Sequence, residues 1–199
     1  MSTTRDEDRT SAAAEQQQIG GAPDIAGGDA APASWGEPRS RTITWYDPLA
    51  TAAEGAKLPG RAYLEAIADG TLPPPPIASM LDFRIVEVSD GEIRFAVVPD
   101  ESAYNPIGLV HGGLVCTLLD SVVGCAVHTQ LPAGTGYTSI ELKVSYVRPI
   151  HAHTGEIHAH GWVSKPGRRV AFAEGDVRDG DGKLLATASS SLLIMTPDG

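Results

Sequence analysis

Residues 110–130, VHGGLVCTLLDSVVGCAVHTQ, are the most informative part of this 199-residue chain for predicting its fold. Its apolar side chains occupy nearly every side of a helical wheel, which predicts a short helix buried within the protein. Strand-like segments surround it: two within residues 77–99, joined by a turn at Asp90-Gly91, and one each in residues 137–147, 155–163, 169–178 and 183–195. Strands clustered around one helix, without regular strand–helix alternation, indicate an α+β domain whose antiparallel sheet wraps about its helix.

Three regions are predicted along the chain. Residues 1–57 are rich in Ala, Gly, Pro, Gln and charge, and we expect a disordered extension because such a segment buries too little apolar surface to offset the entropy of ordering. Residues 58–76 hold a helix over 61–69 and a proline-rich extended spacer. Residues 77–196 form the strand-rich domain. One buried strand face is predicted there from the alternating residues Ile140, Leu142, Val144 and Tyr146.

Composition and charge narrow the classes of function. The formal net charge of −10 argues against a nucleic-acid partner, because such binding needs a dense cationic face. No window approaches the roughly 18 apolar residues of a membrane helix, and the charged N-terminus does not match a secretory signal. We therefore expect a cytoplasmic protein without a membrane partner. Cys116 and Cys125 are too far apart on one helix for a disulfide and are predicted to be small core residues.

Two features of the predicted helix suggest chemistry. Asp120 is the only Asp, Glu, Lys or Arg between positions 110 and 140. We expect it to be buried and to act as a general base or nucleophile, with a hydrogen-bonded structural carboxylate as the alternative. His111-Gly112-Gly113 opens the helix, where unpaired N–H groups suit a carbonyl oxygen that becomes an oxyanion. A tight turn without a ligand is the alternative for these glycines.

The spacing of these two features predicts an oligomer. Gly112 and Asp120 are about 12 Å apart along one helix, so they cannot both contact one reacting carbonyl. If they cooperate, a second copy of the helix must run antiparallel beside the first. We therefore predict an isologous homodimer with two shared active sites.

The string Asn105-Pro-Ile-Gly-Leu-Val-His-Gly-Gly113, with Asp120 beyond it and Thr138-Ser-Ile-Glu-Leu-Lys143 following, resembles the hotdog-fold thioesterases of the PaaI-like, phenylacetate-pathway group. The resemblance covers roughly residues 68–195. It implies the hotdog fold, in which an antiparallel sheet wraps around a long central helix. It further implies hydrolysis of acyl-CoA thioesters by homodimers or homotetramers, without a metal or other cofactor.

The resemblance also implies a role for each site residue. The Gly112 N–H polarises the thioester carbonyl, and His111 shapes that turn near the sulfur. Asp120 of the facing subunit activates water or itself attacks the carbonyl. Asn105 positions water or substrate, and Ser139 orients the water near the carboxylate. A slip of one residue in strand register would exchange Ser139 with the threonine before it.

Coenzyme A carries phosphates, so an acidic chain needs a local cationic patch to bind it. The candidates are Arg148, Lys165, Arg168 and Arg169. The four histidines of HAHTGEIHAH, residues 151–160, could suggest a metal site, but only Glu156 adds a nearby carboxylate. We expect these histidines to face solvent from a strand and predict no metal.

Acyl-CoA thioester hydrolysis is therefore the predicted function, with two alternatives. A non-catalytic acyl-CoA binding or sensing module would use the same groove, but it gains nothing from a costly buried carboxylate. A hotdog hydratase or dehydratase would need an acid–base pair aimed at substrate carbons, whereas the helix start suits carbonyl polarisation. The acyl specificity depends on the pocket floor, and a protein-interaction role for the N-terminal extension stays open.

Overall fold

The structure is a computed structural model and describes residues 33–196. The chain divides into two units between Thr42 and Ile43. In the first, the described residues hold one short 3-10 helix, η1 (Ala33–Trp35). The prediction of disorder for residues 1–32 lies outside the described residues. All elements discussed below belong to the second unit.

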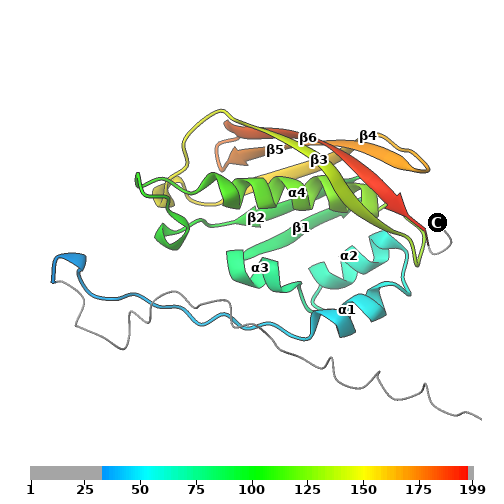
Figure 1. The fold of residues 1–199 in the computed structure, drawn as a ribbon, viewed down its shortest axis with the longest axis horizontal. Helices are drawn as coiled ribbons and strands as arrows, with labels where there is room; N and C mark the ends of the chain where they lie inside the picture. Colours follow the sequence, from blue (N-terminus) through cyan, green and yellow to red (C-terminus); the bar gives the residue numbers. More distant parts are fainter. Residues whose placement is uncertain (1–32, 197–199) are drawn as a thin grey trace, which may run out of the picture. The chain divides into compact units, whose positions relative to one another are not determined.

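Six strands form one antiparallel sheet with the order β1-β2-β4-β5-β6-β3. Their bounds are β1 (Phe83–Ser89), β2 (Glu92–Val97), β3 (Gly136–Tyr146), β4 (Ile157–Lys165), β5 (Val170–Asp179) and β6 (Leu184–Met195). The long helix α4 (Gly112–His128) lies against this sheet and contacts every strand except β1 extensively (Figure 1). The predicted α+β fold, a sheet around one buried helix, is confirmed.

Glycines in the sheet allow α4 to approach the strands closely. Gly161 of β4 and Gly175 of β5 are register partners. A Cβ atom at Gly161 would lie 2.3 Å from the carbonyl oxygen of Val122, and one at Gly175 would lie 3.2 Å from a methyl carbon of Val123. Both valines are fully buried. The middle of α4 therefore packs directly on the backbone of β4 and β5.

Three short helices precede the sheet: α1 (Pro48–Gly55), α2 (Gly60–Ala68) and α3 (Pro76–Leu81). The sequence predicts α2, but residues before 58 were expected to be disordered, and α1 corrects that expectation. Asp47 caps α1 by accepting hydrogen bonds from the N–H groups of Leu49 and Ala50. Gly134 then donates to the carbonyl of Ala56 at 2.9 Å, which ties the end of α1 to the loop after α4.

Helix α3 corrects a second expectation, because it lies where the first strand was expected to begin. Pro76 occupies its first turn, where proline is favoured, and Asp82 ends the helix in the left-handed conformation with φ 57°. Strand β1 consequently starts at Phe83. The β1–β2 turn lies at Asp90-Gly91 as predicted, and the strands predicted over residues 137–195 match β3 to β6 within two residues at each end.

Among residues 33–196, no helix has the length and apolar character needed to cross a bilayer.

The substitution Gly161→Ala tests the close packing of α4 on the sheet. We expect it to lower the free energy of unfolding by about 1–3 kcal/mol or more, because the added methyl group overlaps the Val122 carbonyl. Gly180→Ala is the matched control, since its nearest heavy atom would lie 3.9 Å away. Urea denaturation measures both variants. Equal stability of the two would contradict the packing argument.

Candidate active site

His111 is the structural cap of α4. Its backbone is extended, with ψ 133°, and its Nδ1 accepts a hydrogen bond from the Gly113 N–H at 2.8 Å. Its own N–H donates to the carbonyl of Ala103 at 2.7 Å. Because Nδ1 is an acceptor here, the neutral ring carries its proton on Nε2. His111 therefore shapes the turn, and Nε2 is its ring nitrogen available to a ligand.

The first turn of α4 leaves one amide available. The Gly113 N–H is bound by His111, and the Leu114 N–H donates to the His111 carbonyl at 3.0 Å. The Gly112 N–H has no acceptor among residues 33–196. The Gly112 carbonyl, by contrast, accepts from the Tyr146 hydroxyl at 2.9 Å, which holds the turn against β3. A free N–H at the positive end of a helix dipole can bind a developing oxyanion.

Asn105 organises the loop before α4. Its Oδ1 accepts from the N–H groups of Ile107 and Leu109, both at 3.1 Å, while Gly108 takes a left-handed conformation with φ 80°. The side-chain oxygen is thus committed to the loop, and the Nδ2 amide is the group left to donate to a ligand. The loop borders a cavity of about 390 Å³. Its lining includes Asn105, Gly112, Val115, Tyr146, Arg148 and Ile150.

Asp120 lies in the middle of α4 and is exposed on the single chain, so the expectation that it is buried is wrong. The sheet and the N-terminal helices cover other faces of the helix and leave this one open. Ser139 donates its hydroxyl to Asp120 Oδ1 at 2.7 Å. Thr138 is exposed, since consecutive strand residues face opposite sides. The structure therefore brings Ser139, and not Thr138, to the carboxylate.

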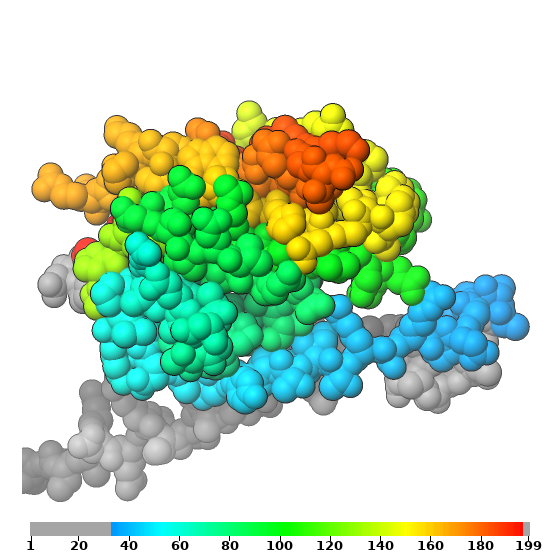
Figure 2. Space-filling model, turned by 180° about the vertical axis from the view of Figure 1, so that it is seen from behind, coloured from blue at the N-terminus to red at the C-terminus, as the bar shows by residue number. Residues whose placement is uncertain are grey.

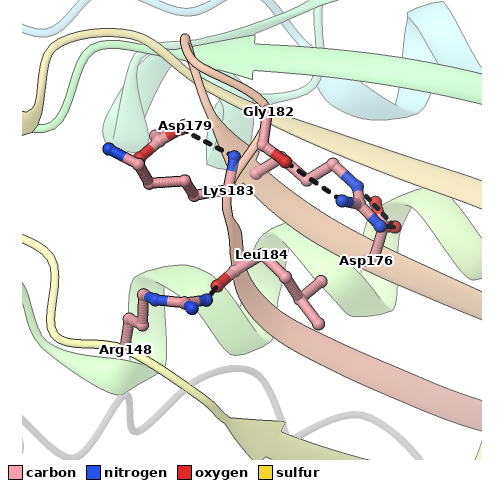
Figure 3. Close-up of polar contacts among 7 residues, drawn as sticks. Arg148, Asp176, Asp179, Gly182, Lys183 and Leu184 are labelled. Carbon is pink, nitrogen blue, oxygen red and sulfur yellow. Dashed lines mark hydrogen bonds and ion pairs between the residues drawn. The ribbon is translucent and has the colours of Figure 1, made fainter.

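The four cationic candidates do not converge within the chain. Arg148 follows β3, lines the cavity at Gly112, and donates to the Leu184 carbonyl at 2.5 Å, beside the turn between β5 and β6 (Figure 3). The other three are exposed at the hairpin between β4 and β5: Lys165, Arg168 and Arg169. That hairpin lies toward the C-terminal end of α4, because Val163 bonds to Gly91 and Gly91 to Thr129.

The histidines of residues 151–160 are mostly partly buried rather than solvent-facing. His158 and His160 contact the carboxylates of Glu156 and Glu92 at 3.4 and 3.1 Å. His151 and His153 stack with ring centroids 4.8 Å apart. Within residues 33–196, no three potential ligands gather in a metal-binding arrangement.

A larger cavity, of about 550 Å³, was not predicted from the sequence. It lies between α2, α3, β1 and the C-terminal half of α4. Burial raises the pKa of the Cys125 thiol to about 11 and the pKa of the Tyr137 hydroxyl well above its usual value, and it lowers the pKa of His128. These three side chains are therefore neutral near pH 7. One feature of the sequence, the apolar face of the helix predicted over residues 61–69, indicates that this segment packs against other apolar residues here.

Comparisons with known proteins identify the family of the chain. Residues 107–186 match the thioesterase superfamily. Human acyl-coenzyme A thioesterase 13 is 32% identical over 106 residues, which cover 51% of this chain and 72% of that protein. A provisionally named esterase of Halobacterium salinarum is 31% identical over 133 residues, 61% of this chain and 86% of the relative.

A solved structure supports the same assignment. A phenylacetic acid degradation-related protein from Ralstonia eutropha JMP134 superposes with a TM-score of 0.60 at 29% identity, covering 66% of this chain and 98% of that protein. The resemblance to PaaI-like hotdog thioesterases, drawn from residues 105–143, is confirmed. The chain therefore belongs to the thioesterase superfamily of enzymes and has the hotdog fold.

Proposed function

We propose that the protein hydrolyses acyl-CoA thioesters to a free acid and coenzyme A. The observation that carries this proposal is the hydrogen bond from Ser139 to Asp120, on the same helix whose first turn presents the unpaired Gly112 N–H. Thioester hydrolysis needs an activated water and a stabilised oxyanion. Asp120 supplies the base for the water, and Gly112 supplies the N–H for the oxyanion. Coenzyme A enters only as part of the substrate.

The proposed reaction begins with water held by Asp120. Ser139 occupies Oδ1, so Oδ2 is free to take a proton from the water as its oxygen attacks the thioester carbonyl. The Gly112 N–H stabilises the tetrahedral oxyanion, which collapses by breaking the carbon–sulfur bond. The sulfur leaves as the coenzyme A thiol by taking up the proton that Asp120 removed from water, which restores the carboxylate. Direct attack by Oδ2 is the alternative. It displaces the coenzyme A thiolate and forms a mixed anhydride, and hydrolysis of that anhydride at its aspartyl carbonyl would place labelled oxygen from water in Asp120 during a single turnover.

A second subunit completes the proposed site. Gly112 and Asp120 of one chain are about 12 Å apart along the rigid helix. The open face of α4 carries the small residue Gly113 one turn before Thr117, so a second helix can approach closely and antiparallel. The edge strand β3 exposes Ile140 and Tyr146, each 56% accessible, which a second copy would cover. In this homodimer, and in a dimer of dimers built from it, Asp120 faces the partner's Gly112.

Arg148 is the cationic residue that this arrangement favours for the phosphates of coenzyme A. It lines the cavity beside Gly112, so it lies on the side of the thioester that carries the coenzyme. Its bond to the Leu184 carbonyl leaves further guanidinium N–H groups for a phosphate.

Asp120→Asn tests the proposed base. We expect kcat to fall by about 10²–10⁴, because the amide cannot accept the proton from water. Ser139→Ala removes one hydrogen bond and is expected to cost about tenfold or less. Thr138→Ala is the matched control and should retain full activity. Release of free thiol from acyl-CoA measures all three variants, and wild-type turnover by Asp120→Asn would overturn the assignment.

Gly112→Pro tests the oxyanion donor. Proline is tolerated at the first helical position, and the extended backbone of His111 suits a residue before proline. The variant lacks the N–H, so we expect kcat to fall by about 10²–10³. Gly112→Ala keeps the N–H and adds a Cβ at the same position, 3.0 Å from the Tyr146 ring. Equal losses in both variants would show that packing, and not the N–H, causes the effect.

Hybrid dimers test whether two subunits share each site. Chains carrying Asp120→Asn and chains carrying Gly112→Pro, with different affinity tags, are co-expressed and the hybrids isolated. Each hybrid has one site with both groups intact, so we expect about half of the wild-type activity from two inactive parents. Inactive hybrids would place the complete site within a single chain.

A further inference from the structure

The cavity of about 550 Å³ forms a channel along one face of α4. Ser121, Cys125 and His128 line it, and their spacing of four and three residues puts them on one side of the helix. Helices α2 and α3 cover the channel, and β1 and β2 contribute its opposite wall. Figure 2 shows α2 in cyan and α3 in blue-green, against the green of the neighbouring elements.

The channel begins next to the proposed catalytic carboxylate. Ser121 directly follows Asp120 in the chain. Tyr137, which also lines the channel, is two residues before Ser139 on the same face of β3. From there the channel runs toward the C-terminal end of α4, away from Gly112. A carbonyl held at Asp120 can therefore place one of its two substituents in the channel.

The channel walls suit a hydrocarbon and not the coenzyme. Leu64 and Ile67 of α2 lie opposite Phe83 and Phe95, whose rings stack 5.5 Å apart. The one charged lining residue is Arg84, and its guanidinium is bound to the Glu156 carboxylate at 2.6 Å. An apolar wall without a free countercharge disfavours phosphate and favours apolar surface.

Tyr63 and His128 close the far end of the channel. Their rings meet edge to face with centroids 5.8 Å apart. Tyr63 is held in place because its ring packs directly on the Gly55 backbone, where a Cβ would lie 2.4 Å from the ring. Gly60 fixes α2 itself, since its N–H donates to the Leu131 carbonyl at 3.0 Å. Both rings also line a second cavity, of about 250 Å³, so they form the wall between that cavity and the channel.

Resting on the proposed function, we propose that this channel binds the acyl group of the thioester in the subunit that supplies Asp120, and that Ile67 and Tyr63 set the acyl-chain length that the enzyme accepts. Ile67 determines the depth available below α2, and Tyr63 stops the chain at the far end. The N-terminal helices α2 and α3 are thus specificity elements of the hydrolase.

Ile67→Trp tests the proposal by filling the channel. Saturated acyl-CoAs of increasing length, starting from acetyl-CoA, are compared by kcat/KM. We expect kcat/KM on the longer substrates to fall by at least about tenfold relative to kcat/KM on acetyl-CoA, since single methylenes in an apolar pocket already discriminate by that factor. Glu65→Trp is the matched control, because it puts the same ring on the exposed side of the same helix. A uniform loss at all lengths, or none, would overturn the proposal.

Two further measurements keep the outcomes distinct. Tyr63→Ala removes the end wall and should shift the optimum toward longer chains, so the proposal is testable even if Ile67→Trp does not fold. Binding of non-hydrolysable alkyl-CoA thioethers, measured by calorimetry, does not depend on turnover. In one outcome, the wild-type protein binds longer thioethers more tightly, Ile67→Trp loses this preference, and yet the protein does not hydrolyse acyl-CoA. That result would overturn the proposed function and support the channel. Binding that is independent of length would overturn the channel assignment.

Discussion

The structure depends on the contact between α4 and the strand backbone at Gly161 and Gly175. Without side chains at these two positions, Val122 and Val123 sit directly on the sheet, and the helix is enclosed on most sides. A helix packed in this way is rigid, so the distances between the groups along it are fixed. The amide at Gly112 and the carboxylate at Asp120 are therefore permanently too far apart to act on one carbonyl within one chain. In the proposed reaction, each of these groups therefore acts together with its counterpart from a second chain.

The same helix separates polar chemistry from apolar binding. Its first turn has a free amide, its middle has an exposed carboxylate oriented by Ser139, and its C-terminal half lines an apolar channel. Groups buried around that channel are neutral, because burial raises the pKa of Cys125 and lowers the pKa of His128. Asp120, the proposed base, instead remains at the open face of the chain. In the proposed dimer the second chain covers this face, so bulk water is excluded and only the attacking water stays at the carboxylate.

The N-terminal helices α1 and α2 are attached to the helix that carries the proposed site. α1 and α2 are anchored to the loop after α4 by backbone bonds at Gly134 and Gly60, so their position follows that of α4. Their short length gives them little stability of their own, since isolated helices of this size are marginal in water. Tertiary contacts with the end of α4 supply the stability that local helix propensity does not. In the proposed channel, substrate preference therefore depends in part on helices that precede the sheet.

The buried helix, the strands and the helix start at His111-Gly112 could be predicted from the sequence, because periodicity and capping signals are local. The choice of Ser139 over Thr138 came from a bulge between Ser139 and Glu141, which turns Ser139 inward and leaves Ile140 exposed despite the regular alternation of the strand. The exposure of Asp120, helices α1 and α3, and the channel also came only from the tertiary structure. Each depends on which distant segments cover a given face, and local pattern does not specify such long-range contacts.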